Sequence, residues 1–138
     1  MSVVSKISSS ILTDAEVAGL IAEGFPAGSF RDKRVLLIVP DGTRTAPVGL
    51  MFKTLFSQIA GVTKAFDVMI ALGTHAPMSE EAICGRLEIT MEERCGRYRN
   101  VQFFNHEWDN PAMLRDLGTI PASEISELSG GLFAMDVP

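Results

Sequence analysis

The sequence is poor in several features, and each shortage argues against a class of protein. Its only two cysteines, Cys84 and Cys95, form no CxxC pair and no metal-ligand spacing. No apolar run approaches the roughly 20 residues that cross a bilayer, and the N-terminus has no sustained apolar core or small-residue cleavage site. The chain has a formal charge of −5 at pH 7, so it does not have the excess of basic residues that is typical of nucleic-acid-binding proteins. We therefore expect no nucleic-acid partner, no membrane partner and a reducing, cytoplasmic location.

Several short catalytic motifs are also missing. The chain has no GxGxxG, Walker or GxSxG sequence, so a dinucleotide site, a P-loop and a serine hydrolase lack local support. No HxH or HExxH spacing is present, and no autonomous metal site is expected. What remains is a chain of 138 residues, 46% hydrophobic and 21% charged, which suits one globular domain.

Hydrophobic periodicity predicts alternating helices and strands. TDAE at 13–16 is a capping box that begins a helix, because the Thr13 hydroxyl and the Glu16 carboxylate can each accept from the other's backbone amide. Apolar runs with both faces hydrophobic predict buried strands, and helical stripes lie between them. The strands are expected over 34–40, from 65 and from 101, and the further helices over 48–61 and 79–89, the last capped by Ser79.

This order predicts the fold class. Alternating strands and helices with right-handed crossovers give an α/β, Rossmann-like parallel sheet with flanking helices. We expect one domain over 1–138, with polar loops at the C-terminal strand ends. Three polar clusters, DGTR, GTH and NHEWD, follow the predicted strands. Open α/β sheets bind ligands beyond the carboxyl ends of their strands, so these clusters should lie along one edge of the sheet.

The first cluster combines an anion, a hydroxyl and a guanidinium in one turn: Asp41, Thr43 and Arg44. A guanidinium can hold a carboxylate or phosphate through two parallel hydrogen bonds. The alternative is structural, with Asp41 capping the next helix or pairing with Arg44 as part of the turn.

The second cluster places His75 after Gly73 and Thr74. A histidine at a strand end can be purely structural. It can also be an acid–base group, because Asp41 at the neighbouring strand end could accept one ring N–H, fix the tautomer and raise the basicity of the other nitrogen. Thr43, Gly73 and Thr74 are further candidates for a loop that lines a cofactor or ligand.

The third cluster contains His106, the only other histidine in the chain. It also ends a predicted strand, which makes it a candidate site residue. Phe104 and Trp108 beside it favour instead a packed corner with a structural histidine.

Together, DGTRTAP at 41–47, IALGTHAPMSEEAI at 70–83 and NHEWDNPAMLRDLGT at 105–119 resemble the N-terminal domain of the lactate racemase family. The resemblance covers the chain from about Thr13 onward. Its specificity comes from three ordered motifs at matching strand ends. It implies an isomerase that racemises or epimerises 2-hydroxy acids with a nickel-pincer nucleotide cofactor.

The resemblance also implies roles for individual residues. In this family, hydride passes from the α-carbon to the cofactor while a histidine removes the hydroxyl proton. His75 matches one of two catalytic acid–base histidines, Asp41 matches its orienting carboxylate, and Arg44 matches the arginine that binds substrate. His106 matches a family motif without an implied catalytic role.

The chain departs from the family pattern downstream. The second catalytic histidine, the cofactor-anchoring lysine and the nickel-binding histidine occur in and beyond a PHxxxGFSGGxK-type region, whereas no histidine follows His106 and no lysine follows Lys64. We therefore expect an N-terminal fragment, inactive alone, whose partners are a 2-hydroxy acid and the missing C-terminal part of the same polypeptide. The alternative is a non-catalytic module that binds a small carboxylate or phosphate.

Overall fold

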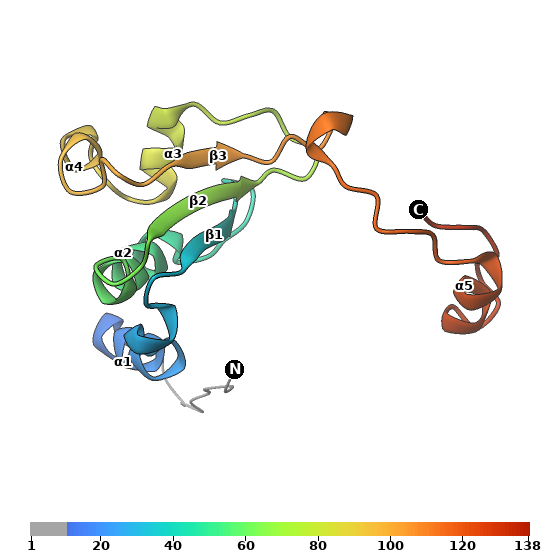
Figure 1. Ribbon diagram of the computed structural model, residues 1–138, viewed down its shortest axis with the longest axis horizontal. Coiled ribbons are helices and arrows are strands. Elements are labelled where there is room, and N and C mark those ends of the chain that lie inside the picture. The colour runs from blue at the N-terminus through green and yellow to red at the C-terminus, as the bar shows by residue number, and fades with distance from the viewer. Residues whose placement is uncertain (1–10) are drawn as a thin grey trace. The chain divides into compact units, whose positions relative to one another are not determined.

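The computed structural model describes residues 11–138 and divides into two compact units, one ending at His106 and the other spanning Glu107–Pro138. All three strands lie in the first unit (Figure 1). The expectation of a single domain over 1–138 stays a prediction. The elements of the first unit are α1 (Asp14–Gly24), the 3-10 turn η1 (Ala27–Phe30), β1 (Arg34–Pro40), α2 (Val48–Ile59), β2 (Ala65–Ala71), α3 (Glu80–Arg86), α4 (Met91–Cys95) and β3 (Phe103–Asn105).

The helix starts that local sequence predicts are confirmed. Thr13 caps α1 in a full capping box, in which its hydroxyl accepts from the Glu16 amide and the Glu16 carboxylate accepts from the Thr13 amide. Ser79 caps α3 by accepting from the Ala82 amide at 3.2 Å. These caps fix where each helix begins, and the second also fixes the end of the loop that follows β2.

The sheet is parallel throughout, with strand order β1-β2-β3, which confirms the predicted α/β class. Pro40 pairs with Ala71 and Ile70 pairs with Asn105, so the three strands end at nearly the same level. The chain therefore leaves each strand at the same edge of the sheet.

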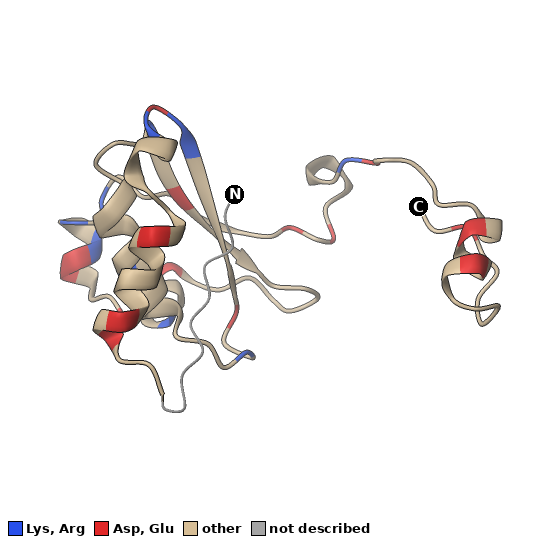
Figure 2. Ribbon diagram, turned by 90° about the horizontal axis from the view of Figure 1, so that it is seen from below, with Lys and Arg blue, Asp and Glu red and all other residues tan. Residues whose placement is uncertain are grey.

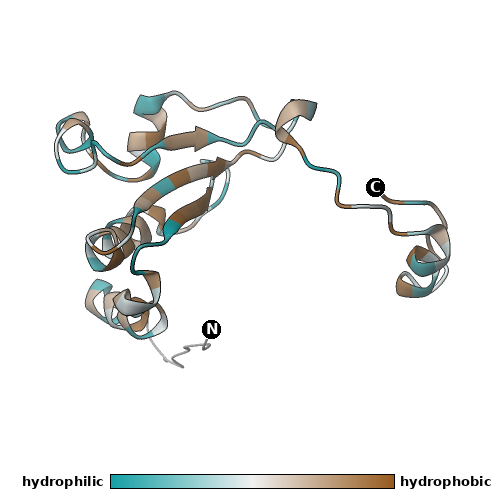
Figure 3. Ribbon diagram, viewed as in Figure 1, coloured by the Kyte–Doolittle hydropathy of each residue, from teal (hydrophilic) through white to brown (hydrophobic). Residues whose placement is uncertain are grey.

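One face of the sheet packs against the helices. Alternate residues of β2, Phe66, Val68 and Ile70, are buried against α2, whose Phe52 is fully buried. Much of the ribbon of α2 and β2 has the colour of hydrophobic residues (Figure 3). Tyr98 joins this cluster, with its ring 5.1 Å from that of Phe52, and links the chain after α4 to the same core.

The expectation that strand 34–40 is buried on both faces is wrong. Leu36 and Ile38 on β1 are 46% and 61% exposed. Through the register, Ile38 lies beside Met69, and Met69 beside Phe104, which is 45% exposed on the same face. In the first unit the helices gather on the opposite side of the sheet (Figure 2), and β1 is an edge strand. The apolar residues of 34–40 indicate a preference for burial, but they do not indicate whether another element covers each face of the strand.

The second unit contains the 3-10 turn η2 (Pro111–Met113) and α5 (Ala122–Leu128). An antiparallel bridge between Ile120 and Val137 closes it, and the Asp136 carboxylate accepts from the Ala122 amide at 2.8 Å at the start of α5. Over residues 11–138, no helix combines the length and the apolar character needed to cross a membrane.

Phe52→Ala tests the core. We expect a loss of about 3–5 kcal/mol in the free energy of unfolding, because Phe52 is fully buried among other rings and truncation leaves a cavity. Ile38→Ala, on the open face, should lose less than about 1 kcal/mol. Urea unfolding followed by circular dichroism measures both, and equal losses would contradict the one-sided core.

Candidate active site

The loops after β1 and β2 lie side by side because their strands pair in register. β1 ends at Pro40 and β2 at Ala71, which are partners in the ladder. The next residues begin the two polar loops that contain Asp41 and His75. Residues 34 positions apart in sequence are thus brought together by strand pairing.

Asp41 and His75 form a direct hydrogen bond. His75 Nδ1 lies 2.6 Å from Asp41 Oδ2. The Asp41 side chain is 8% exposed and the His75 side chain 56% exposed. One partner is therefore held inside the loop, while the other presents its ring to solvent at the strand edge.

Thr43 holds the other oxygen of this carboxylate. Asp41 Oδ1 accepts from the Thr43 hydroxyl at 2.6 Å and from the Thr43 amide at 3.0 Å. The hydroxyl bond, the amide bond and then the contact with His75 lower the pKa of Asp41 from 3.8 to about 2, against the opposing effect of burial. Thr43 thus keeps Asp41 ionised.

The ionisation of Asp41 determines the tautomer of His75. A carboxylate only accepts, so the hydrogen in the 2.6 Å contact belongs to His75 Nδ1. In the neutral ring, Nε2 then carries the lone pair. The arrangement matches an acid–base histidine whose carboxylate fixes its orientation.

The His75 loop turns tightly after β2. The His75 amide donates to the Leu72 carbonyl at 3.1 Å, and Gly73 has φ of +60°. This left-handed conformation is easy for glycine and strained for residues with a Cβ. Gly73 therefore allows the backbone turn that places His75 at the end of β2. The Thr74 side chain makes no hydrogen bond with the residues that the structure describes.

Arg44 has a free side chain among the described residues, with no hydrogen bond or ion pair to its guanidinium. The structural alternative, in which Asp41 pairs with Arg44 or caps the next helix, is not what the loop does. Asp41 bonds to Thr43 and His75 instead, and α2 has Pro47 at its N-cap without a side-chain bond. Arg44 is available to bind an anion.

His106 is not joined to this pair. Its amide donates to the Ile70 carbonyl at 3.0 Å and extends the strand pairing, but its ring makes no hydrogen bond with a residue in 11–138. The structure brings together Asp41, Thr43 and His75, and among the described residues no hydrogen bond joins His106 to them.

Two residues without a predicted role contact the site loops. The Arg86 side chain reaches the Asp41 loop from α3, and the Asn105 side chain reaches the His75 loop from β3. Both contact backbone atoms that are at least 27 positions away. No local pattern marks such contacts, because they depend on how the strands and helices pack.

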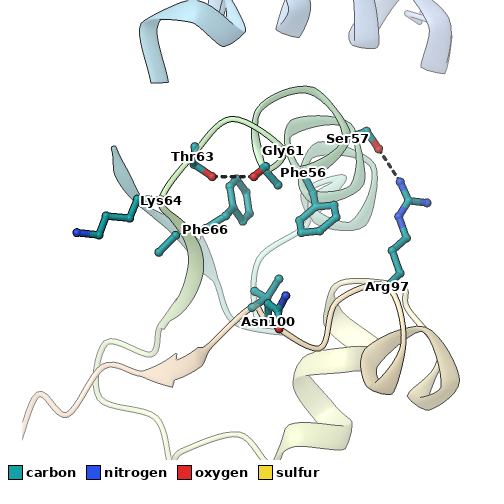
Figure 4. A pocket seen from close by; sticks show the side chains of 11 residues that line it. Phe56, Ser57, Gly61, Thr63, Lys64, Phe66, Arg97 and Asn100 are labelled. Atoms are coloured by element: carbon teal, nitrogen blue, oxygen red, sulfur yellow. Dashed lines mark hydrogen bonds between the residues drawn. The ribbon is translucent and has the colours of Figure 1, made fainter. Parts of the chain in front are cut away.

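A cavity of about 530 Å³ lies elsewhere, beside the residues that enter β2 and leave α2. It is thus near the amino end of the strand, away from Asp41 and His75. Its polar groups do not converge. Lys64 points away from the other labelled side chains, and Arg97 donates to Ser57 at 2.8 Å (Figure 4). The acid–base pair, rather than this cavity, is the candidate site.

The site does not supply a metal-binding set. Within the described part of the chain, no three His, Cys, Asp or Glu side chains are grouped closely enough to hold a metal ion. One imidazole paired with one carboxylate does not fit a nickel site.

Comparisons with known proteins agree with the fold and the motifs. A family model described as the lactate racemase N-terminal domain matches residues 17–129. A crystal structure of a protein from Thermotoga maritima, a target of the Northeast Structural Genomics Consortium, is similar with 31% identity and a TM-score of 0.74. The match covers 92% of this chain and 29% of that protein. No curated protein matches the chain.

Thr43→Val tests the electrostatics of the pair. Removing the hydroxyl donor should raise the pKa of Asp41 from about 2 toward 3.8, and carboxyl ¹³C NMR titration measures it. Because the folded pKa is depressed, ionised Asp41 stabilises the fold above about pH 4, and this is lost as the pH falls toward 2. In the variant this stabilisation should be smaller, and its loss should be complete at a higher pH, because the folded pKa lies closer to the unfolded value. Thr45→Val, in the same loop, is the matched control. An unchanged pKa in Thr43→Val would refute this role of the hydroxyl.

Proposed function

Because the chain belongs to the lactate racemase N-terminal domain family, we propose that it supplies one acid–base group and a substrate-binding arginine to a 2-hydroxy-acid racemase or epimerase. The observation that carries this proposal is the 2.6 Å hydrogen bond between Asp41 and His75 at the carboxyl edge of a parallel sheet. The family supports the reaction class, and the geometry supports the role that we propose for this chain.

The chemistry assigned to His75 is transfer of the hydroxyl proton. Its Nε2 lone pair accepts the proton from the substrate hydroxyl, and the ring becomes imidazolium. Asp41, ionised down to about pH 2, faces the protonated ring and stabilises it. In the reverse direction the same nitrogen returns the proton.

Arg44 is the proposed anchor for the substrate carboxylate. Its guanidinium is uncommitted among residues 11–138 and belongs to the same loop as Asp41. Two parallel N–H···O bonds would fix the carboxylate plane and so direct the 2-hydroxyl group.

The proton step is only part of the reaction. In the reaction of the lactate racemase family the hydrogen of the α-carbon leaves as hydride, and imidazole, carboxylate and guanidinium groups do not accept hydride. The nickel-pincer nucleotide therefore stays a prediction for the complete enzyme. The chain spans 29% of the Thermotoga maritima protein that it resembles. We accordingly propose that the chain alone is inactive.

The alternative function is binding of a small carboxylate or phosphate without turnover. The guanidinium of Arg44, which makes no hydrogen bond among the described residues, supports this alternative, because it can bind an anion without the help of an acid–base group. The two functions differ in one measurable property. In the complete, cofactor-loaded protein, the enzyme converts one enantiomer of a 2-hydroxy acid into the other, whereas a binding module leaves the configuration unchanged.

His75→Ala tests the acid–base assignment in the complete enzyme. We expect kcat to fall by about 10²–10⁴-fold, the usual contribution of a positioned general base. His106→Ala, the matched histidine, should change kcat less than about tenfold. Racemisation followed by chiral chromatography measures both, and near-normal turnover in His75→Ala would overturn the assignment.

Arg44→Ala tests the substrate anchor separately. We expect KM to rise by roughly 10- to 100-fold, because a hydrogen bond to a charged group contributes about 1.5–3 kcal/mol. Arg115→Ala removes the same charge from the second unit and should leave KM near its original value. An Arg44→Ala enzyme with unchanged KM would show that the carboxylate binds elsewhere.

A further inference from the structure

Arg86 connects α3 to the loop that contains Asp41. Its Nε donates to the Pro40 carbonyl at 3.0 Å, and its Nη2 donates to the Arg44 carbonyl at 2.8 Å. These two acceptors flank Asp41 and Thr43 on either side. A planar guanidinium carries donors at fixed angles, so one side chain sets the separation of the two ends of the turn.

Little else ties this turn to the rest of the first unit. The Thr43 bonds to Asp41 lie within the turn itself. Among the side-chain bonds of the described residues, those that reach the turn from outside come from His75 and Arg86. Arg86 therefore contributes, together with the β1–β2 ladder, to the position of Asp41 relative to β2.

Asn105 makes the corresponding connection to the His75 loop. Its Oδ1 accepts from the Met78 amide at 2.9 Å, and its Nδ2 donates to the Met78 carbonyl at 3.0 Å. One side-chain amide thus satisfies both backbone groups of a single residue, as a neighbouring strand does. Asn105 ends β3, whereas Met78 lies between His75 and the N-cap of α3.

We propose that Arg86 and Asn105 are a pair of positioning residues, each of which uses two hydrogen bonds to the backbone to hold one partner of the Asp41–His75 pair. The proposal rests on the proposed function for its catalytic meaning. The hydrogen bonds of both side chains go to backbone atoms of other residues in the loops and not to His75 or Asp41, so both act through the loop backbone. A misplacement of about 1 Å can lower a rate on the order of 100-fold, which makes such supports consequential.

A simpler role for Arg86 is to stabilise α3, since it is a basic residue in the last helical turn. The observed bonds do not fit that role alone. Both go to carbonyls of the Pro40–Arg44 segment. A helix-stabilising residue would alter overall stability, whereas a positioning residue alters the geometry of the turn specifically.

The test of Arg86 uses the 138-residue chain and NMR. In Arg86→Gln we expect the Thr43 amide to exchange at least about tenfold faster and the pKa of Asp41 to rise from about 2, because the turn that holds the carboxylate loosens. The Val68 amide in β2 should keep its rate. In Arg86→Lys the exchange rate of the Thr43 amide should lie between those of the wild type and Arg86→Gln. An ammonium keeps the charge but has no planar arrangement of donors that could bridge both carbonyls. Arg99→Gln, an exposed arginine, is the matched control.

Two outcomes overturn the role of Arg86. Unchanged Thr43 exchange and Asp41 pKa in a folded Arg86→Gln chain would show that the turn holds itself. Equal acceleration of Thr43 and Val68 would show a global effect on stability. If Arg86→Gln does not fold, Arg86→Lys decides between the same outcomes.

Asn105 is tested by removing its bonds one at a time. Asn105→Asp keeps an acceptor for the Met78 amide and loses the donor, whereas Asn105→Ala loses both. We expect Met78 amide exchange to rise in the order wild type, Asp, Ala, and the His75 Nδ1–H signal to weaken in the same order. Asn100→Ala, which removes a surface amide, is the control. An unchanged His75 signal in folded Asn105→Ala would overturn this role.

Kinetics of the complete enzyme separate this proposal from the proposed function. Arg86→Gln should lower kcat and raise KM, each about tenfold or more, because Arg86 holds the segment of both Asp41 and Arg44. Asn105→Ala should mainly lower kcat. If His75→Ala remained active while the NMR changes occurred, the positioning role would stand and the catalytic role would fail. If His75→Ala were inactive but Arg86→Gln and Asn105→Ala changed nothing, the reverse would hold.

Discussion

The hydrogen bond between Asp41 and His75 depends on parallel strand pairing, and the rest of the site depends on that bond. Each partner sits in a loop just after a strand, and the ladder places Pro40 opposite Ala71. A shift of one residue in this register would separate the two side chains and turn alternate strand residues to the wrong face. The buried residues of β2 therefore specify the core and the site together, since Val68 and Ile70 hold the register from which both loops begin.

The two members of the pair have opposite surroundings, and the difference is useful. Asp41 is nearly buried and its two oxygens accept from Thr43 and His75, which keeps it an anion. The His75 ring has one nitrogen committed and most of its surface exposed. A fixed anion beside an accessible ring nitrogen suits the proton transfer that we propose for His75.

Local chemistry predicted much of the first unit. The capping box at Thr13, the cap at Ser79 and the order of strands and helices all follow from short-range patterns, and from them the meeting of Asp41 with His75. The rest depends on tertiary packing. The exposure of one face of β1 could not be predicted, because the sequence RVLLIVP is apolar on both faces whether or not a helix covers each of them. Arg86 and Asn105 were missed because their partners are distant backbone atoms, which carry no sequence signature.

Both supports of the site bind main-chain atoms, and this has a consequence for how such a site can diversify. Arg86 holds the carbonyl of residue 44, not its guanidinium, and Asn105 holds the amide and carbonyl of residue 78, not its thioether. The scaffold is therefore indifferent to the side chains at these positions. During evolution, these side chains can be exchanged while the backbone contacts around the Asp41–His75 pair are kept.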